Sequence, residues 1–152
     1  MPNCKISITI EVESTDWHSV SLKNLCSLKE IPKGPGTYLL HHGPLFDAWP
    51  TTSVFYIGAA YAEGLWKRAR KHRSVLLGEK TRDGENDKIR GSKAMKEYRE
   101  SIGHKIDDVY FSYILYEKDV KPYIPFVVES ELLIYFKKHN NDLMPQANRG
   151  QR

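Results

Sequence analysis

Two neighbouring stretches of the sequence carry residues that could act together on a phosphate group. The run over residues 54–58 is apolar, contains Tyr56 and ends at a glycine, which is typical of a buried strand before a turn. The charged segment that follows predicts a helix over about residues 63–72, with Arg68 and His72 one turn apart on the same side. A strand that supplies a tyrosine and a helix that supplies an arginine and a histidine indicate phosphate chemistry.

Other elements must position these side chains. Glycines and prolines at residues 32–36 interrupt the chain and precede a predicted strand over residues 37–41. This strand and the strand over residues 54–58 follow each other in the chain, and a connection of this length predicts an antiparallel hairpin. Residues 109–116 are almost all apolar or aromatic, which predicts a central strand. Residues 126–138 then predict a helix that is buried on much of its surface.

The remaining segments carry weaker patterns. Residues 5–12 alternate apolar and polar side chains and predict a half-buried strand, whereas residues 15–34 predict a short helix or an irregular segment. The charged stretch 79–91 predicts an exposed loop, and residues 92–103 predict a short helix with a narrow apolar stripe. Together the elements predict an α/β (α+β) fold, in which a small, mainly antiparallel central sheet is flanked by helices.

Composition limits the class of protein. The chain has 152 residues, of which 40% are hydrophobic and 28% charged, so we expect one globular domain over residues 1–152. A net charge of +4 weakly favours anionic partners such as nucleic acid. The two cysteines, Cys4 and Cys26, lack the spacing of a zinc cluster or a disulfide framework. Because no signal peptide or membrane span is predicted, we expect a cytoplasmic protein without a membrane partner.

The ordered pattern resembles the signature of the GIY-YIG nucleases. That family pairs Gly-x-Tyr with Tyr-Ile-Gly on two strands, then has a Leu-x-x-Arg-x-x-x-His helix, a glutamate opening an apolar helix, and Pro-x-x-Asn. The corresponding residues here are Tyr38, Tyr56, Leu65, Arg68, His72, Glu129, Pro145 and Asn148. One such element has little value, but five in order over residues 36–148 are specific to the family.

The sequence departs from the family pattern in several places. The connection between the two strands is long, residues 73–105 resemble an insertion, and residues 1–34 form an N-terminal extension. Ala59 stands where several relatives carry a lysine. Glu129 is followed by leucines three and four positions later, as the family pattern favours, and Glu131 is its close rival.

The resemblance implies a divalent-metal-dependent DNA endonuclease that hydrolyses phosphodiester bonds. Glu129 would hold one Mg²⁺ or Mn²⁺, because these hard cations prefer oxygen ligands. Arg68 would contact a non-bridging phosphate oxygen through its planar guanidinium. Tyr38 would position or deprotonate the attacking water.

The resemblance gives the other site residues supporting roles. Tyr56 and His72 would assist Tyr38 through hydrogen bonds or proton relay, and Asn148 would orient other groups of the site. Each residue, taken alone, has an ordinary structural explanation: a strand-packing tyrosine, a solvated helix charge, or a cation near a helix end. Only the joint order favours an active site.

The helix over residues 92–103 offers a second, weaker functional signal. One of its sides carries Lys93, Lys96 and Arg99, which is most often simply a solvated face. In a compact nuclease such a face, together with the insertion that contains it, could contact DNA phosphates.

Several alternatives stay open. A restriction-type enzyme would read a short double-stranded site and either form a homodimer or cut the strands in sequence. A repair, recombination or mobile-element nuclease would take its specificity from a partner or from DNA structure. The alternative outside the enzymes is a non-catalytic nucleic-acid-binding module on a decayed nuclease fold. RNA is a further candidate substrate, because phosphate and metal contacts do not distinguish the sugar.

Overall fold

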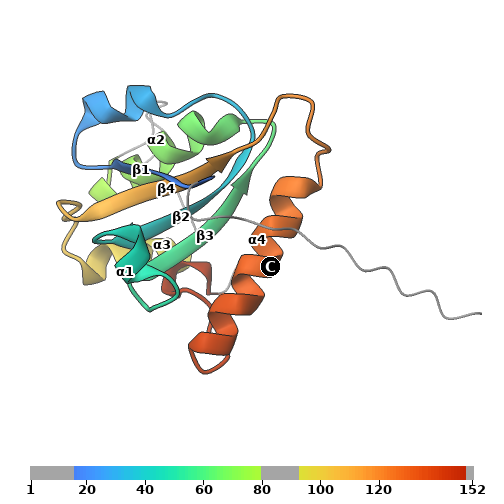
Figure 1. Ribbon diagram of the computed structural model, residues 1–152. Helices are drawn as coiled ribbons and strands as arrows, with labels where there is room; N and C mark the ends of the chain where they lie inside the picture. The colour runs from blue at the N-terminus through green and yellow to red at the C-terminus, as the bar shows by residue number, and fades with distance from the viewer. Residues whose placement is uncertain (1–15, 80–92, 150–152) are drawn as a thin grey trace, which may run out of the picture.

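The computed structural model describes residues 16–79 and 93–149. Their centre is a four-stranded antiparallel sheet in the order β1-β4-β2-β3 (Figure 1). The strands are β1 (His18–Ser21), β2 (Gly36–His42), β3 (Val54–Ala60) and β4 (Val109–Leu115). The predicted fold class, a small antiparallel sheet with helices, is confirmed.

The register of the sheet brings the two tyrosine motifs together. β2 and β3 form the predicted antiparallel hairpin, in which Tyr38 lies opposite Gly58. On the other side of β2, Tyr38 is paired with Tyr113 of β4. β4 therefore lies between two strands, as its continuous apolar sequence predicts.

Helices lie on both faces of this sheet (Figure 1). They are α1 (Leu45–Ala48), α2 (Gly64–Leu77), α3 (Lys93–Ser101) and α4 (Ile124–His139), with short 3₁₀ helices η2 (Leu25–Glu30) and η3 (Gln146–Asn148). Because neighbouring strand residues point to opposite faces, Tyr38 packs with α2 and α3, whereas Leu39 packs with α1 and α4. The tyrosine side of the site therefore has α2 and α3 on its own face of the sheet, whereas α4 packs on the opposite face.

The predicted end of one helix is wrong, and the structure contains two short elements, β1 and α1, that the sequence does not predict. α2 continues past His72 to Leu77 and ends at Gly78, whose φ of 73° is the left-handed cap that favours glycine. The first residues of the supposed insertion therefore belong to α2. The segment over residues 15–34 contains strand β1 as well as η2, and the loop of the hairpin contains α1. These short elements lack the length over which a hydrophobic period becomes visible.

Two predictions of burial are also wrong. α4 has nearly the predicted bounds, but it buries only Pro125, Val128 and Phe136, because the sheet touches one side of it. In α3 the predicted apolar stripe is confirmed. Arg99, which the sequence places on a solvated side of this helix, is only 4% exposed. Arg99 is covered because α3 packs against the end of α2, where Gly78 lies beside its side chain.

Some predictions concern residues outside the described ranges. The predicted strand over residues 5–12 lies outside the described residues, as do residues 80–91 of the predicted loop and residue 92 of the helix predicted over residues 92–103. Within the described ranges, no helix has the length and apolar character needed to cross a bilayer.

Candidate active site

Tyr38, Tyr56 and His72 meet on the α2 face of the sheet. The Tyr38 hydroxyl oxygen lies 2.8 Å from Nε2 of His72. The centroids of the Tyr38 and Tyr56 rings are 6.0 Å apart, and those of Tyr56 and His72 are 4.7 Å apart. Residues from β2, β3 and α2 that the sequence separates by up to 34 positions thus form one hydrogen-bonded aromatic cluster.

Gly58 makes this cluster sterically feasible. A Cβ at this position would lie 2.5 Å from the Cζ and hydroxyl oxygen of Tyr38 and 2.8 Å from Cε1 of Tyr56. Such distances are far below van der Waals contact, so any side chain at position 58 must displace the two rings. The glycine therefore serves close packing of the tyrosines across the hairpin.

Gly58→Ala is expected to break the Tyr38–His72 hydrogen bond and to destabilise the protein by about 1–3 kcal/mol, the usual cost of overpacking. Urea unfolding measures the stability, and the imidazole NMR signals of His72 report the hydrogen bond. Gly43→Ala is the matched control, because its added Cβ meets no atom within 4 Å and acts only through its φ of 72°. Unchanged His72 signals in Gly58→Ala would contradict the steric account.

Tyr38 and His72 are both uncharged around pH 7. Burial, followed by the nearby Tyr56, raises the pKa of Tyr38 well above 10.0, so its phenol keeps the proton. Burial and the charges of Arg68 and Lys71 lower the pKa of His72 to about 3, so its imidazole is uncharged. Tyr38 and His72 therefore share a hydrogen bond between two neutral groups, whose direction is set by the tautomer of the imidazole.

This depressed pKa predicts an acid-sensitive fold. Because the pKa of His72 is lower in the folded state than its ordinary 6.5, its contribution to stability is present above pH 6.5 and is lost as the pH falls toward 3. His72→Gln is expected to flatten the decline in the urea midpoint between about pH 6.5 and 4. His41, with its pKa lowered to about 4 by burial, acts in the same direction, so part of the decline should remain. Identical pH profiles for variant and wild type would contradict this assignment.

Arg68 lies one turn before His72, beside an acidic residue that sequence reasoning missed. Its Nε is 3.3 Å from Oε2 of Glu63, and its side chain is 40% exposed. Glu63, at the start of α2, also accepts a hydrogen bond from Nζ of Lys71 at 2.5 Å. This bond and the neighbouring cations lower the pKa of Glu63. Glu63 thus fixes one side of the guanidinium while the rest of the side chain stays accessible.

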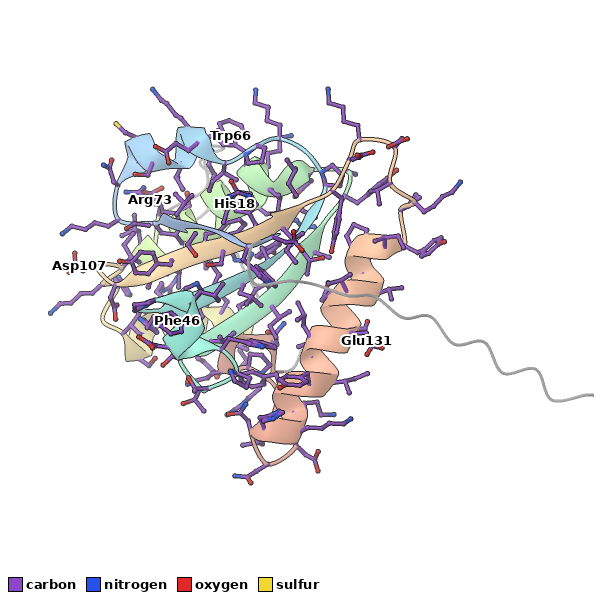
Figure 2. The ribbon with its side chains drawn as sticks, in the orientation of Figure 1. His18, Phe46, Trp66, Arg73, Asp107 and Glu131 are labelled. Atoms are coloured by element: carbon purple, nitrogen blue, oxygen red, sulfur yellow. The ribbon has the colours of Figure 1, made fainter. Side chains whose placement is uncertain are left out.

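Of the two rival glutamates, Glu129 interacts through its charge with Tyr38 and Arg68. Burial raises the pKa of Glu129, while the positive charge of Arg68 lowers it. The charge of Glu129 in turn raises the pKa of Tyr38, so the three groups lie within electrostatic reach of one another. Glu131 is exposed and lies on the side of α4 that faces away from the sheet (Figure 2). Residues two positions apart differ by about 200° around a helix, which explains why only one of them faces the sheet.

The available ligands limit the kind of metal site. In the ranges 16–79 and 93–149, no three His, Cys, Asp or Glu side chains gather as a closed metal site. Glu129 accepts no hydrogen bond from the described residues, which leaves its half-buried carboxylate free to bind a cation. Mg²⁺ is commonly held by one or two carboxylates together with substrate phosphates and water. The residues therefore fit an ion that Glu129 shares with a phosphate substrate.

Asn148 supports β3 without reaching the cluster. Its Oδ1 accepts a hydrogen bond from Ile57 N at 2.8 Å, and its Nδ2 donates to Ile57 O at 2.9 Å. β3 is an edge strand of the described sheet, so this side chain satisfies backbone groups that would otherwise be unpaired. Asn148 thereby holds in place the strand that carries Tyr56 and Gly58.

Thr37 is a second residue that sequence reasoning missed. Its hydroxyl donates to the carbonyl oxygen of Pro125 at 2.9 Å, which ties the start of α4 to β2. Glu129 lies one turn further along α4, so this bond helps to fix the part of the helix that carries it. The signal in the sequence was only a threonine beside Tyr38.

The site therefore combines tyrosines from β2 and β3, a cation and a neutral histidine from α2, and a carboxylate from α4. Such a set can bind a phosphate, hold a water by hydrogen bonds and accept a proton. The comparisons with protein-family models, curated proteins and solved structures gave no match for this chain.

Proposed function

We propose that this protein is a divalent-metal-dependent DNA endonuclease. The observation that carries the proposal is the Tyr38–His72 hydrogen bond, placed beside Arg68 and Glu129 and coupled to both by charge. Phosphodiester hydrolysis needs an oriented water, a cation on the phosphate and stabilisation of the leaving oxygen. Each requirement has a candidate residue in this cluster.

Each residue has a separate role in the proposed reaction. Arg68 binds a non-bridging oxygen and neutralises charge that grows on the phosphate. Tyr38, whose hydroxyl oxygen lies 2.8 Å from Nε2 of His72, orients the attacking water by a hydrogen bond for in-line attack. Glu129 would hold the metal ion, which when bound supplies Lewis-acid stabilisation of the phosphate and the leaving oxygen.

The surroundings of the cluster support a polyanionic substrate. On α2, the Arg70 guanidinium lies 4.5 Å from the ring centroid of Trp66, and Nζ of Lys33 lies 5.2 Å from it. Lys67 and Lys71 are exposed on the same helix. A basic surface beside Arg68 can follow the phosphates that flank the scissile bond, and we take double-stranded DNA in the cytoplasm as the proposed setting.

The test is incubation of purified protein with supercoiled plasmid and Mg²⁺ or Mn²⁺. We expect nicked and linear products that EDTA abolishes, and no products with Arg68→Ala. A parallel incubation with single-stranded and duplex RNA separates DNA from RNA cleavage. Equal cleavage by wild type and Arg68→Ala would show a contaminant and refute the proposal. Metal-dependent DNA binding without cleavage would favour the non-catalytic alternative.

A further inference from the structure

Several large apolar side chains on and beside α4 are left exposed by the described residues. Five of the nine large hydrophobic residues exposed in the described ranges lie between residues 123 and 143, so exposure is concentrated on this helix and its ends. They are Tyr123, Phe126, Ile134, Tyr135 and Leu143, each between 48% and 54% exposed. Of these five residues, Ile134 and Tyr135 lie beside the same hollow, and an exposed apolar patch that lines a hollow can mark an interaction site.

This surface is hollowed as well as apolar. A depression of about 440 Å³ adjoins α4 and is lined by Trp49, Leu132, Ile134 and Tyr135, with Glu131 and Lys138 at the same place. The ring of Trp49 stacks on Tyr135 at a centroid distance of 5.8 Å, which fixes one wall. A preformed hollow can receive a side chain from another molecule.

The charges beside the hollow are arranged symmetrically about its apolar centre. Glu131 and Lys138 are seven residues apart, which places them on the same side of the helix, about 10 Å from each other along its axis. Ile134 and Tyr135 lie midway between them. Neither charge forms an ion pair with any residue in the described part of the chain.

We propose that this surface binds a second copy of the chain, with the two α4 helices antiparallel about a two-fold axis near Ile134 and Tyr135. In that arrangement each Glu131 faces Lys138 of the partner subunit, and the apolar centres meet. A two-fold interface requires a self-complementary patch, and opposite charges at equal distances from an apolar midpoint satisfy that condition. Glu129 lies on the sheet side of α4, so pairing leaves the candidate active site open.

The mass of the protein in solution tests this pairing. Sedimentation equilibrium from about 1 to 100 μM, a range that reports homodimers of ordinary affinity, is expected to show a monomer–dimer equilibrium. Ile134→Asp should raise the dissociation constant at least about 100-fold, because it places a carboxylate in the apolar centre. Leu25→Asp is the matched control: Leu25 is 58% exposed on η2, and its variant should dimerise like wild type. Circular dichroism confirms that both variants fold.

A charge exchange tests the antiparallel geometry. Glu131→Lys and Lys138→Glu should each weaken their own homodimer at least about tenfold, because like charges then face each other across the axis. Mixing the two variants should restore a dimer that contains one copy of each, since every pair is again opposite in charge.

A wild-type monomer at all concentrations, or a dimer that survives Ile134→Asp, would overturn the proposal. Failure of the mixture to pair would overturn the antiparallel arrangement. Self-association through α4 does not depend on nuclease activity, so these outcomes leave the proposed function untouched.

Discussion

Replacing Arg68 by lysine is expected to reduce the rate of DNA cleavage at least about 100-fold, although the positive charge is kept. The Nε of Arg68 lies 3.3 Å from the Glu63 carboxylate, and its other guanidinium nitrogens can still reach a phosphate. A lysine has one ammonium group, which cannot hold Glu63 and a phosphate oxygen in the same geometry. Initial rates on a labelled duplex, at saturating substrate, measure the loss.

Arg70→Lys is the control for the Arg68 prediction. Arg70 lies on the same helix, is exposed and stacks on Trp66, so its replacement should change KM but leave kcat within about twofold. Wild-type kcat in Arg68→Lys would mean that the guanidinium does not contact the reacting phosphate.

Replacing Glu129 by glutamine is expected to abolish both metal-dependent thermal stabilisation and cleavage, the latter by at least about 1,000-fold. The same variant should be at least as stable as wild type in EDTA. Burial raises the pKa of Glu129 in the fold, so the stability it contributes is present below its ordinary pKa of 4.5 and is lost as the pH rises through the folded value. At neutral pH the ionised carboxylate of Glu129 therefore destabilises the fold, and the neutral amide of glutamine removes this destabilisation. Melting temperatures with EDTA and with Mn²⁺ measure both effects.

Glu131→Gln separates the role of Glu129 from a general effect of removing charge from α4. It should keep the full Mn²⁺-dependent rise in melting temperature, because Glu131 faces away from the sheet. If Glu131→Gln loses the Mn²⁺-dependent rise in melting temperature and Glu129→Gln keeps it, the metal ligand is Glu131 and the assignment to Glu129 is wrong. A drop in the EDTA melting temperature of Glu129→Gln would contradict the raised pKa.

The sequence predicted those elements whose patterns are long and consistent. The β2–β3 hairpin follows from apolar runs bounded by Gly36, Gly43 and Gly58, and the central position of β4 follows from a strand without a polar face. α3 was located by a stripe at helical spacing, in which Met95 and Tyr98 are buried. Ordered motif residues also located the tyrosines, the arginine and the histidine that the structure brings together.

What the sequence did not predict depends on contacts between distant residues. The apolar sequence of α4 predicted deep burial, but only tertiary packing decides how much of a helix the sheet covers, and here one side stays exposed. The end of α2 covers Arg99, and the sequence of α3 alone cannot predict that contact. The bonds of Asn148 to the backbone of Ile57 join residues 91 positions apart. Glu63 left a local signal that was overlooked, an acidic residue just before a helix rich in cations.

The most direct test of the proposed chemistry is a plasmid cleavage time course that compares wild type, Glu129→Gln and Glu131→Gln in Mn²⁺. All three are measured at a protein concentration at which their masses in solution are the same. The structure predicts nicking by wild type and by Glu131→Gln at similar rates, and none by Glu129→Gln. Cleavage by Glu129→Gln at the wild-type rate would contradict a metal-dependent active site built on Tyr38, Arg68, His72 and Glu129.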